Sequence, residues 1–411
     1  VVLVNGHLVE DRQSCLSGQA GSPVLHTIAD WERNAMVALN TANMQDGARI
    51  DIPAGKIVDG FIHLLFIGKG DGVWSHPRNV IHVGANAQVS IVETYVGSGS
   101  YFTNAVTEIV AGEGAVVDHY RLECESLDAF HVGNVYIRQE RGANVTSRSI
   151  VIGASIARSE THVALAGEGA SITLDGLFTG TGTQHLDNRT VVDHIKPHCE
   201  SLERYKGVLD QHARGVFDGK IIVRPDAQKT VSKQENRNLL LSETAIVDSK
   251  PTLEIHNDDV KCNHGSTIGQ IDAQQLFYLQ SRGISEDEAR NLLVLAFAGQ
   301  IITEVSKSCS IGAATRKSLV SSIGCDPPGE SRSERLGRPL TAEEQSFVAH
   351  LLADSGIAAQ SWAWTEGFHE VVVESDGVVG DPARFLDEWR GAFGAGYREM
   401  FDPADALADI V

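Results

Sequence analysis

The chain has 411 residues, and its 54 aspartate and glutamate side chains outnumber 34 lysine and arginine side chains, which gives a formal charge of −20 at pH 7. This acidic excess argues against nucleic acid or an anionic membrane surface as the main partner. The six cysteines are dispersed and include no Cys-x-x-Cys pair, which favours a reducing compartment.

No apolar run approaches the ~18 residues that suggest a membrane span, and no signal peptide is evident. We therefore expect a cytoplasmic protein that binds neither membrane nor nucleic acid. Val1 already lies in a strand pattern, so we expect that an N-terminal piece is missing. We predict a truncated N-terminal segment at residues 1–47.

This N-terminal segment contains two predicted elements. Residues 1–9 read VVLVNGHLV, and Asn5-Gly6 at their centre is a strong signal for a tight turn, so they predict a hairpin. Residues 30–41 are weakly helical, and Asp30 is the expected N-cap.

From residue 48 to residue 271, short Val/Ile/Thr-rich strands alternate with turns that contain Gly, Asn and Asp. A turn motif of about four residues recurs in this region. The intervals are 28, 29, 26 and 57 residues between the last positions of the motif, which are Ala87, Ala115, Asn144, Ala170 and Ala227. A period in this range predicts a mainly β solenoid, a β-helix. A sandwich or jelly roll is the alternative, because its strands also recur.

The most specific chemistry lies between Leu253 and Val305. Residues 260–265 form a strand-like run after a turn at residues 257–259. Side chains alternate on a strand, so Cys262 and His264 project to the same side. Both can bind a metal, but two ligands do not fill a tetrahedral site. The remaining ligands would have to come from elsewhere in this chain or from another chain.

Two helices are expected at residues 272–305. Asp272 is the N-cap of the first, which runs through Ser281 and ends at Gly283, and residues 285–288 (SEDE) form a capping box that opens the second. Residues 306–338 are rich in Ser, Gly, Arg and Pro and are typical of a linker. Residues 339–411 are an extra segment of unknown function, which we expect to be a small α+β fold or partly disordered.

The run VKCNHGSTIGQIDAQQLFYLQSRGIS resembles the C-terminal signature of the SufB/SufD family of iron–sulfur cluster assembly proteins, and it is closer to the SufD branch. Further matches lie upstream, at residues 38–42 (ALNTA), 75–78 (SHPR), 205–207 (YKG), 213–217 (ARGVF) and 236–242 (NRNLLLS). The resemblance implies a right-handed parallel β-helix flanked by helices.

The resemblance also implies a function. A SufD-like chain is a scaffold and not an enzyme; it pairs with SufB through the end of its β-helix and docks the SufC ATPase with its C-terminal helices. It further implies that His264 contributes to a transient iron–sulfur cluster shared with SufB, and we keep Cys262 as a second candidate. No phosphate-binding glycine motif is present, so we expect no nucleotide site in this chain. The C-terminus departs from the family, and residues 397–410 faintly resemble bacterial NAD-dependent glutamate dehydrogenases.

Two other classes of function are open. His194, His198 and Cys199 lie within six residues and could bind a single metal ion, although a structural turn is the alternative.

Cys124 and Cys199 could carry a persulfide, but nothing in the sequence indicates a lowered thiol pKa.

The second alternative is a carbohydrate-active enzyme, because such enzymes often use β-helices and need paired carboxylates. Glu123 and Glu125 would share a face of a strand, and we interpret them as an exposed, solvated edge. Asp258 and Asp259 are adjacent and would point to opposite faces, which favours a turn.

Overall fold

The computed structural model describes residues 1–10 and 28–308. The chain divides into two compact units, Val1–Gly269 and Gln270–Val411. Our predictions for the linker beyond Ser308 and for the extra segment at residues 339–411 lie outside the described residues. In the part of the chain that is described, no helix is both long and apolar enough to cross a membrane.

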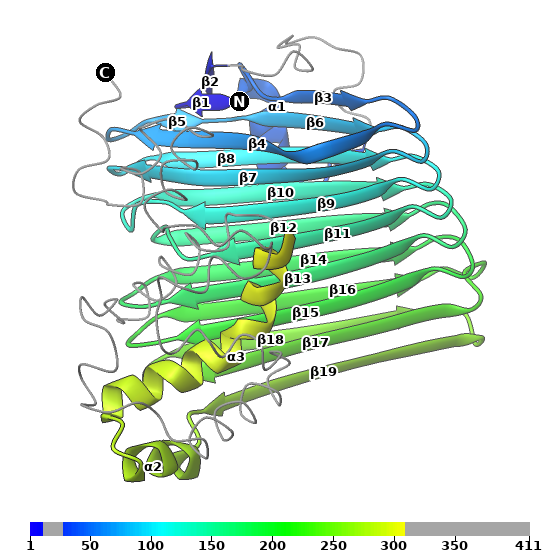
Figure 1. The fold of residues 1–411 in the computed structure, drawn as a ribbon. Helices are drawn as coiled ribbons and strands as arrows, with labels where there is room; N and C mark the ends of the chain where they lie inside the picture. Colours follow the sequence, from blue (N-terminus) through cyan, green and yellow to red (C-terminus); the bar gives the residue numbers. More distant parts are fainter. Residues whose placement is uncertain (11–27, 309–411) are drawn as a thin grey trace, which may run out of the picture. The chain divides into compact units, whose positions relative to one another are not determined.

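The first unit is a parallel β-solenoid, as predicted (Figure 1). Its strands are β1 (Val2–Val4), β2 (His7–Glu10), β3 (Arg49–Ile52), β4 (Ile57–Lys69), β5 (Trp74–Ser75), β6 (Arg78–Val83), β7 (Gln88–Ser98), β8 (Phe102–Ala111), β9 (Val116–Cys124), β10 (Phe130–Gln139), β11 (Asn144–Val151), β12 (Ile156–Leu165), β13 (Ser171–Gly180), β14 (His185–His194), β15 (Glu200–Leu209), β16 (Arg214–Val223), β17 (Thr230–Leu240), β18 (Ile246–Ile255) and β19 (Val260–Gln270).

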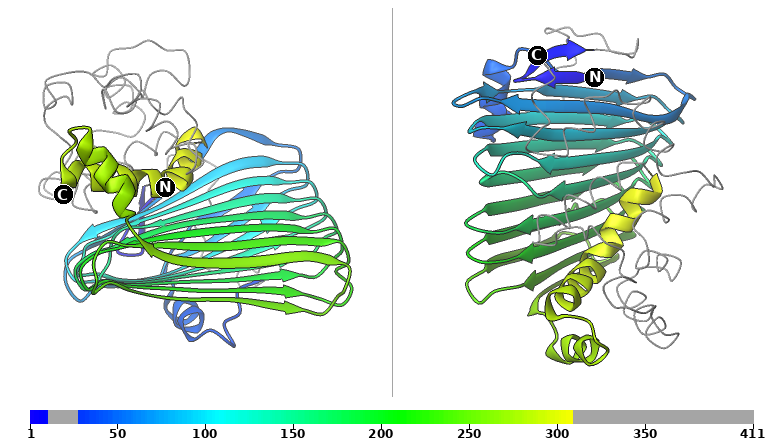
Figure 2. Two further views of the ribbon diagram at one scale, coloured as in Figure 1. Left: turned by 90° about the horizontal axis from the view of Figure 1, so that it is seen from below. Right: turned by 60° about the vertical axis from the view of Figure 1, so that its left-hand side comes forward.

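Successive long strands alternate between two sheets. The ten-stranded sheet has the order β19-β17-β15-β13-β11-β9-β7-β4-β1-β2, and the nine-stranded sheet contains β18-β16-β14-β12-β10-β8-β6-β3 with β5 beside β8. From β8 onward, each long strand pairs with the strand two places earlier, which is the topology of a coil that advances by one rung per turn. The left view in Figure 2 shows the two sheets of the solenoid facing each other.

Because the register of strand pairing continues from rung to rung, buried side chains stack in columns that form the core of the solenoid. Val89 pairs with Val117, Val117 with Val145, and Val145 with Ile172, so these four side chains form one inward column. All four are at most 2% exposed. Each buried side chain of this kind contributes ~1.5–3 kcal/mol through the hydrophobic effect.

A second column runs along one corner of the coil. Six small residues are buried there at equivalent positions: Ala87, Ala115, Ala143, Ala170, Cys199 and Ala227. Our sequence alignment of the turn motif placed Asn144 in this column, and this was wrong by one residue, because Ala143 faces the core. The double interval of 57 residues is explained by Cys199, which takes the place of alanine in the missing turn.

The same corner turns through the left-handed backbone region. Asn86, Gly114, Gly142, Gly169 and His198 have φ between 55° and 70°. Their amides bond to the next rung, as in Asn86 N to Glu113 O at 2.8 Å and Gly114 N to Arg141 O at 2.8 Å. Glycine and asparagine adopt this conformation at low cost, which is why they recur in the motif.

The N-terminal hairpin forms as predicted. Strands β1 and β2 are antiparallel around Asn5 and Gly6, both of which have positive φ, and β1 adds in parallel to β4. The predicted cap of the first helix is wrong. Helix α1 (Ala35–Asn43) is capped by Asn34, whose side chain accepts hydrogen bonds from the amides of Met36 and Val37.

The second unit begins with two helices, α2 (Ala273–Ser281) and α3 (Glu286–Ser308). Asp272 caps α2 as predicted, through its side chain and the amides of Gln274 and Gln275. The capping box that opens α3 is also confirmed, because Ser285 and Glu288 exchange backbone-to-side-chain hydrogen bonds of 3.3 and 3.4 Å. Strand β19 is longer than the predicted run and extends to Gln270.

Candidate functional site

The candidate site lies at the end of the solenoid formed by β18 and β19, which we call the open end. These are the last strands of the nine-stranded and ten-stranded sheets. Three large apolar side chains on them are exposed: Ile246 by 54%, Ile255 by 41% and Ile268 by 53%. A sheet edge with exposed apolar side chains is a template for pairing with another chain.

Cys262 and His264 lie on this open end, on strand β19. Val260 and Cys262 are half-buried and pack against the solenoid core, whereas Lys261 is exposed. His264 is two residues further along, so its side chain is on the same inward face, and it is exposed. The Cys262 thiol and the His264 imidazole therefore lie on the same face of β19, two residues apart, at the open end of the solenoid.

The Cys262 thiol is neutral near pH 7. Burial raises its pKa, and a hydrogen bond with the backbone of Ser232 opposes this only in part. A thiolate would form there when a metal ion displaces the proton, since metal ligands must be deprotonated.

Cys262 and His264 do not complete a metal site by themselves. Among the described residues, no group of three or more His, Cys, Asp or Glu side chains is arranged to hold a metal ion.

The alternative metal site at residues 194–199 is not assembled either. His194 is buried, and its Nε2 lies 2.9 Å from Ser201 Oγ. Burial lowers the His194 pKa to about 4. The Cys199 thiol donates to Gly167 O at 3.3 Å, and His198 is exposed at the corner. These contacts are those of a structural turn.

Our interpretation of Glu123 and Glu125 as a solvated edge is wrong. They are 1% and 6% exposed and lie inside the solenoid. Arg121 Nε is 2.9 Å from Glu123 Oε1, and His131 Nδ1 is 2.6 Å from Glu125 Oε2. Burial alone would lower the His131 pKa, but the two carboxylates raise it. This carboxylate pair is enclosed within the coil and therefore has no open groove in which a glycan could bind.

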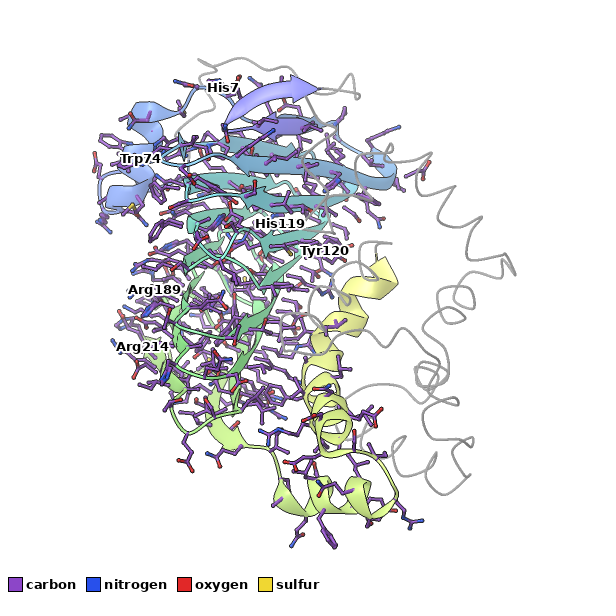
Figure 3. All side chains as sticks on the ribbon, turned by 90° about the vertical axis from the view of Figure 1, so that its left-hand side faces the viewer. His7, Trp74, His119, Tyr120, Arg189 and Arg214 are labelled. Atoms are coloured by element: carbon purple, nitrogen blue, oxygen red, sulfur yellow. The ribbon has the colours of Figure 1, made fainter. Side chains whose placement is uncertain are left out.

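A second ionic group lies on the neighbouring rung. His119 Nε2 is 3.2 Å from Glu93 Oε1, and the Tyr95 hydroxyl donates to Glu93 Oε2 at 2.8 Å. Burial would raise the Glu93 pKa, but the hydrogen bonds and the charge of His119 hold it below its usual value. Figure 3 shows His119 within the solenoid and its neighbour Tyr120 on the other side of strand β9.

Neither internal cysteine has the character of a persulfide carrier. Burial and the nearby charges of Glu123 and Glu125 raise the Cys124 pKa to about 12. Burial also raises the Cys199 pKa. Both thiols therefore stay protonated and weakly nucleophilic at neutral pH.

A polar lining that was not predicted from the sequence lies just inside the open end. Four alternate positions of β17 face inward and are buried although they are polar: Ser232, Gln234, Asn236 and Asn238. Gln234 Nε2 lies 2.5 Å from Oε2 of the fully buried Glu203. Burial raises the Glu203 pKa to about 7. Residues 232–238 (SKQENRN) are all polar, so the sequence did not show which alternate set of side chains faces inward.

Comparison with known proteins assigns the solenoid to a family. A family model described as the SufBD core domain of SUF system iron–sulfur cluster assembly matches residues 66–297. This range is more than half of the chain and includes β19. The chain belongs to the SufB/SufD family.

Individual SufB/SufD relatives agree with this assignment. A SufBD family protein of Synechocystis is 37% identical over 279 residues, which are 65% of this chain and 62% of that protein. Escherichia coli SufD is 32% identical over 260 residues, 63% of this chain and 60% of that protein. Bacillus subtilis SufD is 25% identical over 282 residues, 67% of this chain and 64% of that protein.

The chain thus spans less than two thirds of the length of these SufB/SufD relatives. A second family model, the helical motif 2 of glutamate dehydrogenase, matches residues 382–411. These residues lie outside the described part of the chain, and we assign them no function.

Proposed function

We propose that this chain is a SufD-like scaffold subunit of the cytoplasmic Suf iron–sulfur cluster assembly complex. It has no catalytic activity of its own. It pairs with SufB through the open end of the solenoid and docks the SufC ATPase through α2 and α3. The observation that carries this proposal is that the family match at residues 66–297 includes the exposed strand β19 with its two potential ligands.

The exposed edge of the open end supports pairing with SufB. Strands β18 and β19 end their sheets and carry the exposed isoleucines Ile246, Ile255 and Ile268. Strand pairing with a partner would satisfy the edge backbone groups, and it would bury these side chains.

The incomplete ligand set supports a shared cluster. In this proposal the iron–sulfur cluster is the cargo of the complex, His264 supplies one ligand and SufB supplies cysteines. Cys262 is the weaker candidate, because its thiol is half-buried and its pKa is raised. Motion of SufC driven by ATP would rearrange the interface and open the site.

The partner proposal is tested by co-purification with SufB and SufC, using the full chain and a form cut after Val305. We expect both forms to assemble the complex. Assembly of the full chain alone would assign SufC docking to the segment after Val305. Failure of both forms would contradict the scaffold function.

A further inference from the structure

A pair of hydroxyl groups joins the two terminal strands of the solenoid. Ser266 Oγ on β19 donates a hydrogen bond to Ser249 Oγ on β18 at 2.8 Å. This bond connects the last strand of one sheet to the last strand of the other. Ser266 lies on the same inward face of β19 as His264.

The contact continues into the interior. Ser249 Oγ donates in turn to Asn236 Oδ1 at 2.7 Å. Asn236 is fully buried; its Oδ1 also accepts from Asn238 Nδ2 at 2.6 Å, and its Nδ2 donates to Tyr205 O at 3.3 Å. We call the series Ser266, Ser249 and Asn236 the hydroxyl chain. Its inner end is fixed by hydrogen bonds to two strands of the ten-stranded sheet.

The hydroxyl chain contributes little to the net stability of the core. A buried amide gives less stability than a packed apolar side chain, because it loses water and regains only its hydrogen bonds. At the register position of Asn236, the two preceding rungs carry Tyr205 and Gly176, and the rungs before them carry polar Ser149, Arg121 and Glu93. A directional hydrogen bond does, however, fix the position of the segment that carries it.

The segment that the hydroxyl chain holds in position is strand β19. His264 is two residues before Ser266 on the same face, which corresponds to ~7 Å along a strand. We propose that the hydroxyl chain fixes β19 at the open end and so sets the position from which His264 acts, with Ser249 as the central positioning residue. This inference rests on the proposed function of His264.

The test compares three variants on β18. Ser249→Ala breaks the hydroxyl chain, and Ser249→Thr keeps a hydroxyl at the same position. Thr252→Ala is the matched control, because Thr252 lies on the same strand three residues away and its side chain points to the other face. Two quantities are measured: amide hydrogen exchange of residues 260–270 in the full chain, and cluster yield in the complex with SufB and SufC.

We expect Ser249→Ala to increase exchange in residues 260–270 by about fivefold, as the loss of one hydrogen bond predicts. Exchange in β9 should not change, which shows that the solenoid is intact. Cluster yield should fall while the complex still forms. Ser249→Thr should restore both quantities, and Thr252→Ala should match the wild type.

Two results would overturn the positioning role. The first is exchange in Ser249→Ala that equals that of Thr252→Ala. The second is increased exchange with an unchanged cluster yield, when His264→Ala in the same assay is deficient. A normal yield from His264→Ala would instead refute the proposed function itself, so the two failures are distinguished.

Discussion

Arg78 and Glu108 form an ion pair inside the protein, with Arg78 Nη2 2.5 Å from Glu108 Oε1 and side chains that are 2% and 1% exposed. Glu108 Oε2 also accepts hydrogen bonds from the amides of Ile28 and Ala29, at 3.0 and 3.1 Å. Arg78 Nη1 donates to Asn40 Oδ1 on α1 at 3.2 Å. The pair therefore attaches the segment around α1 to the nine-stranded sheet.

Arg78→Met should destabilise the protein by about 3–5 kcal/mol, because it leaves the buried Glu108 carboxylate without its cation. The measurement is the free energy of unfolding in denaturant. The matched control is Arg138→Met, which removes an exposed 2.9 Å pair with Glu140 and should cost less than about 1 kcal/mol. Equal effects of the two variants would show that the buried pair has no special role.

Glu203→Gln should change how stability depends on pH. Burial raises the Glu203 pKa from 4.5 to about 7 in the folded chain. Below pH 4.5 the carboxyl group is protonated in both states and has no effect. Between pH 4.5 and 7 the unfolded chain ionises first, so this group lowers stability as the pH rises, by about 3 kcal/mol in total.

We therefore expect Glu203→Gln to gain stability over the wild type as the pH is raised from 5 to 8. The check is a series of unfolding measurements across this range. Glu200→Gln, an exposed position on the same strand, is the control and should keep the wild-type pH dependence. A difference between wild type and Glu203→Gln that stays constant with pH would contradict the raised pKa.

Cys199→Ala should be tolerated. Alanine already occupies the equivalent corner position at Ala115, Ala143 and Ala170. The variant loses the thiol contact with Gly167 O and should cost about 1 kcal/mol. Because the pKa of this thiol is raised, we expect the cluster yield of the complex to be unchanged. A large loss of yield in a normally folded variant would identify Cys199 as a sulfur carrier.

Local signals in the sequence were enough to predict much of the fold. The Asn5-Gly6 turn and the capping residues Asp272 and Ser285 each act within four residues, so they form as predicted. The recurrent corner motif predicted the solenoid because every turn repeats the same backbone conformation. The cap at Asn34 is equally local, but it was missed because Asp30, four residues earlier, is also a residue type that caps helices.

The interior polar groups could not be predicted for a different reason. A strand with alternating polar residues has the same pattern whether its polar side faces water or the core. Glu123 and Glu125 follow this pattern, whereas residues 232–238 around Asn236 are all polar, and only the register of the coil places these three side chains inside. Cys262 and His264 were proposed from a short sequence motif, whereas Ser249 lies outside that motif and was not proposed.

The most direct test of the account is cluster assembly by the complex with SufB and SufC that contains His264→Ala. His256→Ala is the control, because His256 is also exposed beside the open end and its side chain pairs with Glu254, with Nε2 3.0 Å from Oε1. Cluster yield is measured by absorbance and by iron and sulfide content. We predict an intact complex with little or no cluster for His264→Ala and a normal yield for His256→Ala. A normal yield from His264→Ala would contradict the central claim.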